Sequence, residues 1–213
     1  DYLFVYNDDV RLTKTAIADL LQAAENFKAN LVRPHVIVGS FKSHDGRTTT
    51  YGGRRRSSGW HPLKFSRIVE PNGTIQTADT LNMNGALISA SALRVVGFLS
   101  DFFIHSGADF EYGLKLTKAG GIVYVAGEHI GTCDLNRQME PPDEFLLTLM
   151  QRLRLLMDIK REPFRQRYQY YKNHGGFFWL FLWVSPYLTV WIRHVWFALV
   201  RISGLSGTKT GAL

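Results

Sequence analysis

The chain has 213 residues, 46% of them hydrophobic and 20% charged, a composition that supports a folded core and excludes an intrinsically disordered protein. Cys133 is the only cysteine, which excludes an intrachain disulfide and a cysteine-based zinc site. The net charge of +7 is uneven, because residues 1–150 hold 15 Lys/Arg against 16 Asp/Glu and residues 151–213 hold 10 against 2. This distribution disfavours a nucleic-acid partner and predicts that the basic carboxyl-terminal part meets an anionic surface, most simply lipid headgroups.

The first predicted element is a buried strand over residues 2–6, an apolar run that leads directly into Asn7-Asp8-Asp9. Adjacent acidic residues at the carboxyl end of a strand stand where α/β sheets bind ligands. Because a domain rarely opens on a buried strand, we expect the full protein to have residues before Asp1. A helix over residues 13–30 and a second strand at 36–39 are predicted next.

Residues 43–71 show no helix or strand periodicity and contain the charge run Arg54-Arg55-Arg56. Turn signals at Asp45-Gly46 and Gly52-Gly53 predict a long polar loop. The arginines belong either to a solvated loop or to a contact with a phosphate or an anionic acceptor, for which arginine is well suited. Long loops in compact domains often carry function, so both interpretations stay open.

Beyond this loop, strands and helices alternate. We predict a strand at 80–89 with a bend at Asn84-Gly85, a helix at 91–97, a helix at 110–118 and a strand at 122–125. The glycines after residue 118 mark the end of the second helix. This alternation is typical of an α/β sheet with flanking helices.

Residues 105–115 place two carboxylates, Asp109 and Glu111, between a glycine turn and a helical run. Their neighbours include Phe110, Tyr112 and Leu114, and an apolar setting of this kind can raise a carboxyl pKa and produce a general base. The alternative is that both are acidic residues of a helix N-terminus, where they complement the helix macrodipole.

The carboxyl-terminal part begins after Pro141-Pro142. Acidic residues at 143–144 and basic residues at 160–161 suit the two ends of one long helix, and a shorter helix is predicted from Pro163 to Asn173. We expect three regions: the carboxyl-terminal portion of a catalytic domain (1–140), a helical extension (141–176) and an aromatic amphipathic tail (177–213).

The segment from Phe177 to Ile202 holds four of the five tryptophans. Ser185 and Pro186 predict a helix start within it, and Arg193 places a charge in its second half. We favour an amphipathic helix or helical hairpin that lies in a membrane interface. A transmembrane span and an aromatic surface for core packing or dimerisation stay open as alternatives.

Five segments stand out in order over about residues 1–175: Tyr6-Asn7-Asp8-Asp9-Val10, Tyr51-Gly52-Gly53, Asn82-Met83-Asn84-Gly85-Ala86-Leu87-Ile88, Asp109-Phe110-Glu111-Tyr112-Gly113-Leu114-Lys115 with His105 upstream, and Arg167-Tyr168-Gln169-Tyr170-Tyr171-Lys172-Asn173. Together they resemble motifs of the family 2 glycosyltransferases of the GT-A fold, in particular the rhamnosyltransferase-like branch that builds surface polysaccharides, the last segment only loosely. The first resembles the family's strand-end form of the DXD motif. Glu111 stands where that family has a second Asp, and Lys115 where it has Arg.

The resemblance implies a GT-A-like, Rossmann-related mixed sheet with flanking helices, incomplete at its N-terminus here and followed by the helical membrane-associating tail. It implies an inverting glycosyltransferase that moves a sugar from a nucleotide-diphosphate donor to a hydroxyl of a glycan or lipid-linked acceptor. With the basic aromatic tail, it predicts a protein at the cytoplasmic side of the cell membrane, peripheral or tail-anchored.

The resemblance also implies roles for individual residues. Asp109 is the expected general base, and Asp9 is the expected ligand of Mg²⁺ or Mn²⁺, a metal that offsets the charge of the leaving diphosphate. Donor or acceptor contacts are expected from Asp8, Asn84, Gly85, His105, Glu111 and Lys115.

Two other functions stay open for this sequence. One is a membrane-associated, non-catalytic scaffold of the same fold, which would show no metal-dependent donor binding. The other is a metal-dependent nucleotidyltransferase or phosphotransferase, which could also use Asp8 and Asp9. Release of a nucleoside diphosphate, as opposed to pyrophosphate, separates sugar transfer from the nucleotidyltransferase.

Overall fold

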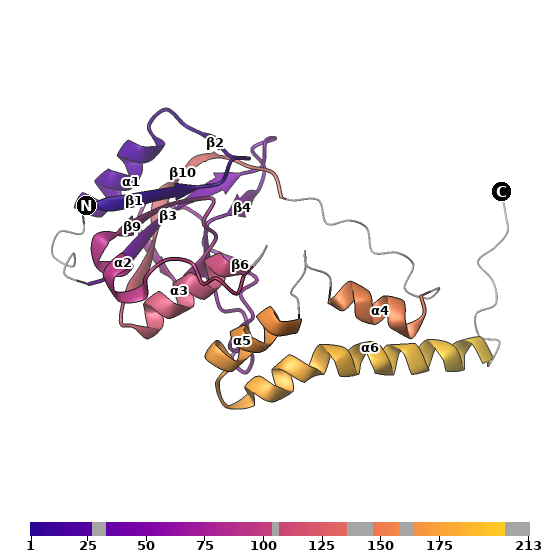
Figure 1. Cartoon of the computed structure of the whole chain (residues 1–213). Helices are drawn as coiled ribbons and strands as arrows, with labels where there is room; N and C mark the ends of the chain where they lie inside the picture. The colour runs from indigo at the N-terminus through magenta and orange to yellow at the C-terminus, as the bar shows by residue number, and fades with distance from the viewer. Residues whose placement is uncertain (27–32, 104–106, 136–146, 158–163, 203–213) are drawn as a thin grey trace, which may run out of the picture. The chain divides into compact units, whose positions relative to one another are not determined.

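The computed structural model describes residues 1–26, 33–103, 107–135, 147–157 and 164–202. The chain separates into two compact units, Asp1–Arg137 and Gln138–Leu213 (Figure 1). The first unit is a mixed α/β domain, and the second consists of helices in its described part. The second unit contains the described parts of both the predicted helical extension (141–176) and the predicted aromatic tail (177–213).

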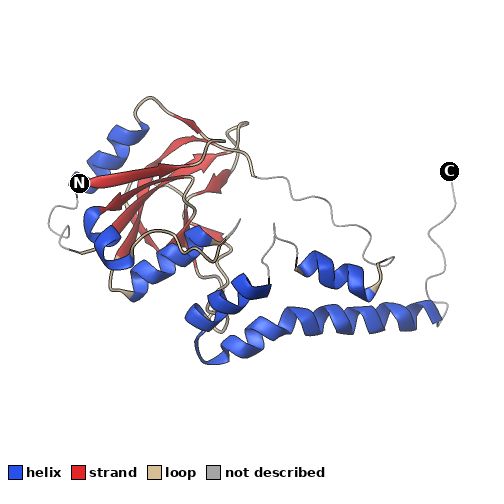
Figure 2. Ribbon diagram, viewed as in Figure 1, coloured by secondary structure: helices blue, strands red, loops and turns tan. Residues whose placement is uncertain are grey.

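The first unit is built on a mixed seven-stranded sheet with the strand order β1-β9-β3-β10-β2, in which β4 also pairs with β3 and β7 with β10 (Figure 2). β3 and β10 are parallel, and the other pairs of this sheet are antiparallel. Its strands are β1 (Tyr2–Tyr6), β2 (Arg11–Leu12), β3 (His35–Lys42), β4 (Thr49–Tyr51), β7 (Gln76–Ala78), β9 (Gly85–Ser89) and β10 (Ile122–Thr132). A small second sheet has the order β6 (Arg67–Ile68), β5 (Gly53–Arg55) and β8 (Thr80–Leu81).

Helices cover both faces of the large sheet. Successive strand residues point to opposite faces of the sheet. On one face, Val36 and Val38 pack into the cluster that contains Tyr112, and on the other face Ile37 packs with Leu20. The helices that supply these clusters are α1 (Ala16–Glu25) on one face, and α2 (Ala90–Val96) and α3 (Ala108–Lys118) on the other. The result is a three-layer arrangement around one sheet (Figure 1).

The structure confirms the prediction of an α/β sheet with flanking helices and corrects several elements. β1 forms at the predicted position, but it stands at one end of the strand order and is only half-buried, so the prediction of a buried strand was wrong: Leu3 and Tyr6 are exposed. The predicted strand at 80–89 is two strands, β8 and β9, which belong to different sheets. β10 continues past residue 125 to Thr132. The prediction ended at residue 125 because two bulges beyond it break the alternation that marks a strand in sequence.

The segment predicted as a loop also contains strands. Gly53–Arg55 forms β5, the central strand of the small sheet, so the charge run is not a solvated loop along its whole length. Arg54 is half-buried, whereas Arg55 and Arg56 are exposed. A Cβ at Gly53 would lie 2.2 Å from a methyl carbon of Val125, so glycine is needed where β5 crosses β10 closely.

The described part of the second unit consists of α4 (Leu149–Leu156), α5 (Phe164–His174), a 3-10 turn at Gly176–Phe178 and α6 (Trp179–Ile202). Helix α5 forms as predicted after Pro163. The described start of α4 is a capping box, in which Thr148 and Gln151 satisfy each other's backbone groups. The acidic and basic residues predicted to end a longer helix, at 143–144 and 160–161, lie outside the described residues.

Helix α6 runs through Pro186 without a break, so the prediction of a helix start at Ser185 was wrong. Proline has no N–H, and the carbonyl of Leu182, four residues earlier, therefore loses its usual helical donor. The hydroxyl of Ser185 donates to that carbonyl at 3.1 Å. Ser185 thus compensates for the proline inside the helix. Across the described part of the chain, none of the helices has both the length and the apolar character that a membrane crossing requires.

Candidate functional site

The carboxyl ends of three strands define one edge of the large sheet. β1 and β3 are both antiparallel to β9, and β3 is parallel to β10, so β1, β3 and β10 run in the same direction. Asn7 follows β1 directly, and Cys133 follows β10. Open α/β sheets bind ligands at such carboxyl edges, so the strand-end acidic residues stand where a ligand site is expected.

Asp9 and Asn84 meet at this edge. The backbone N–H of Asn7 donates to the carbonyl of Asn84 at 3.3 Å, and the Asn84 amide lies 3.8 Å from the sulfur of Cys133. Burial raises the pKa of the Cys133 thiol to about 11, and the negative charge of nearby Asp9 adds to this rise. Gly85 begins β9 beside Tyr6, and a Cβ there would lie 2.8 Å from the ring of Phe41.

The carboxylates of Asp8 and Asp9 are exposed at this edge. No group of three or more His, Cys, Asp or Glu side chains able to hold a metal occurs among the described residues. Mg²⁺ is commonly bound by one or two carboxylates together with substrate phosphates, and not by a complete protein cage. Two carboxylates can therefore be enough protein ligands for such a metal, and Asp8 and Asp9 are the residues at this edge that could hold one.

Asp109 lies in the first turn of α3, two residues after Gly107, whose φ of 91° requires glycine. The Oδ1 of Asp109 accepts a hydrogen bond from the backbone N–H of Phe110 at 2.8 Å, and its Oδ2 accepts one from the Asn82 amide at 3.2 Å. Burial raises the pKa of the Asp109 carboxyl, while these two hydrogen bonds oppose the rise. The setting holds the carboxylate in one orientation and makes it more basic than an exposed aspartate.

Arg54 supports the same site from β5. Its Nε donates to Asn82 Oδ1 at 2.9 Å, and its Nη2 donates to the carbonyl of Thr50 at 3.2 Å. Burial lowers the pKa of the Arg54 guanidinium, while the negative charge of Asp109 raises it. Because the oxygen of the Asn82 amide faces Arg54, its nitrogen must face Asp109, and the amide joins the two charged groups.

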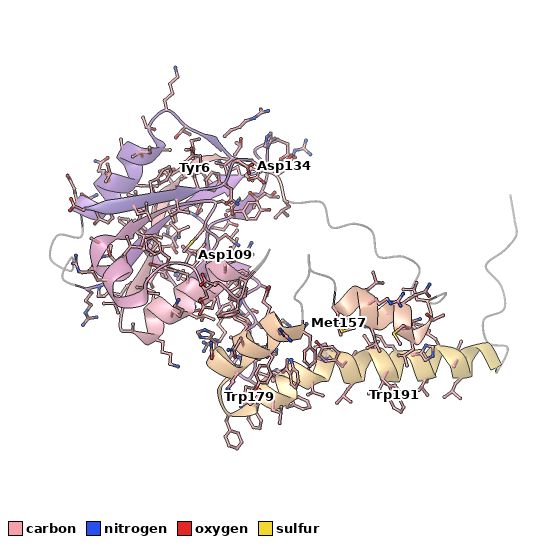
Figure 3. All side chains as sticks on the ribbon, in the orientation of Figure 1. Tyr6, Asp109, Asp134, Met157, Trp179 and Trp191 are labelled. Carbon is pink, nitrogen blue, oxygen red and sulfur yellow. The ribbon has the colours of Figure 1, made fainter. Side chains whose placement is uncertain are left out.

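Residues 80–85 connect Asp109 to the strand-end acidic residues. The hydroxyl of Thr80 donates to the carbonyl of Phe110 at 2.8 Å, and a Cβ at Gly113 would lie 2.4 Å from that hydroxyl oxygen, so α3 packs closely on β8. Asn82 then contacts Asp109, and Asn84 contacts the turn after β1. Figure 3 labels Tyr6, Asp109 and Asp134, which mark β1, α3 and the segment after β10.

The structure does not bring all predicted site residues together. Glu111 lies on a different face of α3 from Asp109, where it is 2% exposed and accepts from the Ser100 hydroxyl at 2.8 Å. Lys115 lies one turn further, with its Nζ 3.7 Å from Glu111 and 3.2 Å from Ser100. Asp8, Asp9, Asn84 and Gly85 gather at the sheet edge, Asp109 lies at the other end of the connecting segment, and His105 lies outside the described residues.

Asn82 was not predicted to have a role, and for Arg54 an anion contact was one of two interpretations of the whole arginine run. Arg54 belongs to a run of three arginines, and nothing in the run distinguishes the inward residue from its exposed neighbours. Asn82 stands two residues before Asn84 in the motif, so the alternation along an extended segment was the available signal.

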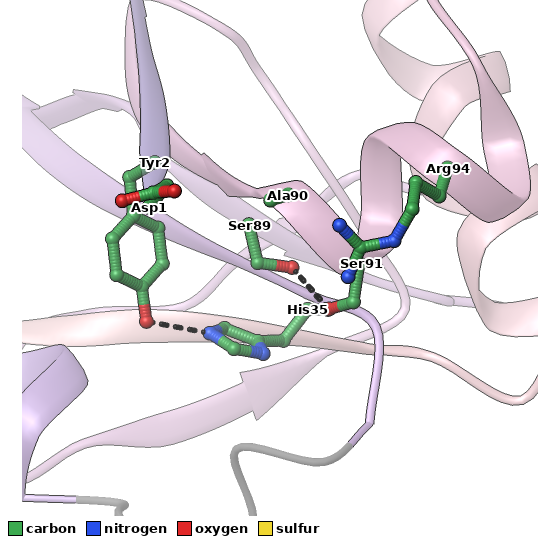
Figure 4. Close-up of a pocket in the computed structure, with 7 residues that line it drawn as sticks. All are labelled: Asp1, Tyr2, His35, Ser89, Ala90, Ser91 and Arg94. Atoms are coloured by element: carbon green, nitrogen blue, oxygen red, sulfur yellow. Dashed lines mark hydrogen bonds between the residues drawn. The ribbon is translucent and has the colours of Figure 1, made fainter.

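A separate cavity of about 400 Å³ lies at the opposite end of β1 (Figure 4). The Tyr2 hydroxyl contacts His35 Nε2 at 2.9 Å, and His35 Nδ1 contacts the carbonyl of Arg33 at 2.8 Å. Since that carbonyl can only accept, Nδ1 carries the proton and Nε2 accepts from Tyr2. These contacts tie β1 to β3 and lie away from the acidic edge.

No family model and no curated protein matches the chain. Among solved structures, the crystal structure of A197 from STIV is similar at 12% sequence identity and a TM-score of 0.37. The match covers 66% of this chain and 71% of that chain. At this level the likeness carries no argument about fold family or activity.

Proposed function

We propose that the protein is an inverting glycosyltransferase with a GT-A-like sheet, which transfers a sugar from a nucleotide-diphosphate donor to an acceptor hydroxyl. One observation carries the proposal: residues 80–85 link the strand-end aspartates to Asp109, through Asn84 at one end and Asn82 at the other. Four of the segments that resemble the family 2 glycosyltransferases thus contact one another, because Asn84 contacts Asn7, and Asn82 contacts both Gly52 and Asp109.

Asp9 and Asp8 form the donor side of the site. A divalent metal bound by Asp9 together with the donor phosphates would supply positive charge against the leaving diphosphate. Asp8 is available to the same metal or to a ribose hydroxyl, because its carboxylate is exposed beside Asp9. Asn84 holds the turn that carries these aspartates through its carbonyl.

Asp109 forms the acceptor side. The acceptor oxygen bonds to the anomeric carbon as the bond from that carbon to the diphosphate oxygen breaks, which inverts the configuration. The acceptor hydroxyl must lose its proton in this step, and a carboxylate with a raised pKa receives it more readily than an ordinary aspartate. Arg54 and Asn82 position Asp109 by fixing the amide that bonds its Oδ2.

The test is isothermal titration of Mn²⁺ with UDP and with dTDP into the full-length protein and its Asp9→Ala variant. Metal-dependent nucleotide binding that Asp9→Ala removes is the expected result. Asp19→Ala, which deletes a carboxylate from α1 on the sheet face covered by that helix, is the matched control and should bind like wild type. Absence of binding to the folded wild type would contradict the proposal and favour the scaffold.

The products separate sugar transfer from nucleotide transfer. A glycosyltransferase releases the nucleoside diphosphate when the acceptor is added, whereas a nucleotidyltransferase releases pyrophosphate. Chromatography of the reaction mixture distinguishes the two. Pyrophosphate as the main product would overturn the proposal even if Asp9 is needed for metal binding.

A further inference from the structure

Helix α6 exposes an apolar side, whereas the apolar side of a helix in a soluble domain is usually buried. Helices of soluble domains turn their polar residues outward, but the outward positions of α6 are mostly large and apolar. Trp196 is 64% exposed and Trp191 56%. We call this surface the α6 face, and its exposed apolar residues are Leu180, Phe181, Leu188, Trp191, Ile192, Val195, Trp196 and Leu199.

The opposite side of α6 is already packed within the helical unit. Trp183 lies against the rings of Phe164 and Tyr168 of α5, at centroid distances of 4.9 and 5.2 Å. The Arg152 guanidinium of α4 lies over the ring of Phe197 at 4.8 Å. The α6 face is therefore a second apolar surface, separate from the core that α4, α5 and α6 share. Figure 3 shows Trp191 on the side of α6 away from α4.

The charge of the same helices has one sign. The sequences of α4, α5 and α6 contain no Asp or Glu. They contain seven cationic residues, namely Arg152, Arg154, Arg165, Arg167, Lys172, Arg193 and Arg201. Arg193 is exposed on α6, three residues before Trp196, and at about 100° per residue it stands at the margin of the α6 face. A surface that combines exposed tryptophans with cations complements an anionic lipid layer.

We propose that the α6 face binds the headgroup region of an anionic bilayer, with α6 parallel to the membrane plane and its tryptophans at the boundary between headgroups and acyl chains. A bilayer is favoured over a protein partner, because α4, α5 and α6 carry only cationic charge, which complements the negative potential of an anionic lipid layer. The inference does not depend on the proposed activity. If both hold, the acceptor is presented at a membrane surface.

The test is flotation of the full-length protein with phosphatidylcholine vesicles and with vesicles that contain about a quarter phosphatidylglycerol. We expect binding to the anionic vesicles, weakened by salt because screening shortens the reach of the cations. The Trp191→Ser/Trp196→Ser double variant should bind at least about tenfold more weakly, since two large apolar side chains no longer enter the interface. Trp60→Ser removes a 72% exposed tryptophan from the first unit and is the matched control, expected to bind like wild type.

A charge variant gives a second measurement. Arg193→Glu should weaken binding to the anionic vesicles more than to the neutral ones, and circular dichroism should show that the helices remain. The proposal is overturned if wild type binds neither vesicle, or if the double variant and Arg193→Glu both bind like wild type. It is also overturned if wild type forms a dimer that the double variant dissociates without any vesicle binding, because the α6 face is then a protein interface.

Discussion

At the scale of single residues, the proposed role of Asp109 as general base rests on how its carboxyl group is held. Burial raises its pKa, and the donors Phe110 and Asn82 hold its two oxygens. Asn82 Oδ1 in turn accepts from Arg54, so one amide links the carboxylate to a guanidinium. Glu111 in the same turn shows the contrast, because its partners Ser100 and Lys115 account for its burial.

Asp109→Asn should lower kcat by about 10²–10⁴-fold, because an amide cannot take the proton from the attacking hydroxyl of the acceptor. Binding of Mn²⁺ with the nucleotide should change little, since Asp8 and Asp9 are untouched. Steady-state kinetics and titration calorimetry check the two parts. Near-normal turnover in the variant would show that Asp109 is not the base.

Asn82→Ala should move the acid limb of the kcat/KM profile to higher pH. The Asn82 amide bonds the charged carboxylate and so lowers the pKa of Asp109, and its loss lets that pKa rise further. The active, deprotonated base then forms only at higher pH, and kcat near neutral pH should fall by about tenfold because the carboxylate loses its orientation. Asn72→Ala, in an exposed turn, is the control, and a pH profile unchanged by Asn82→Ala would exclude this positioning role.

At the scale of elements, helix α3 divides its charged residues between two tasks. Asp109 faces β8 and Arg54, whereas Glu111 and Lys115 join α3 to the segment that contains Ser100. Predictions for these residues therefore differ in kind, although they stand within seven positions of one another in the sequence.

Lys115→Ala should lower stability and leave nucleotide binding intact. The substitution leaves the Glu111 carboxylate, 2% exposed, without its cationic neighbour, at a cost of about 1–3 kcal/mol once the partial exposure of Lys115 is allowed for. Urea unfolding measures the loss. Lys118→Ala removes an exposed lysine from the same helix and should cost less than about 0.5 kcal/mol. Equal stabilities of the two variants would contradict the structural role of Lys115.

Helix α6 shows how an element can differ from the prediction made for it. Proline usually ends a helix or begins one, and Ser185-Pro186 has the composition of a helix start. Inside α6, Ser185 instead satisfies the carbonyl that Pro186 leaves without a donor. Trp183 and Tyr187, on either side of this pair, pack against Phe164 of α5.

At the scale of the whole molecule, the two units differ in composition and in the ligands proposed for them. The candidate site lies in Asp1–Arg137, and the α6 face lies in Gln138–Leu213. Four of the five tryptophans belong to the second unit, and Trp60 belongs to the first. Tryptophan emission of a Trp60→Phe variant therefore reports on the helical unit alone.

In that variant, anionic vesicles should shift the emission to shorter wavelengths, because Trp191 and Trp196 leave water. Mn²⁺ with UDP should leave the emission unchanged, because the proposed donor residues lie in the first unit. Fluorescence titration measures both effects. A nucleotide-induced shift would mean that the helical unit contributes to donor binding.

The sequence by itself determined the α/β class, the strand-end position of Asp8 and Asp9, the start of α3 near Asp109 and the basic, aromatic carboxyl-terminal part. These features depend on local patterns: apolar periodicity, glycine turns and the order of motifs. Only the tertiary structure decided that Asn82 stands between Arg54 and Asp109, that Glu111 pairs with Lys115 and Ser100, and that α6 exposes Trp191 and Trp196. Contacts between residues that are distant in sequence depend on how strands and helices pack, and no local pattern specifies that packing.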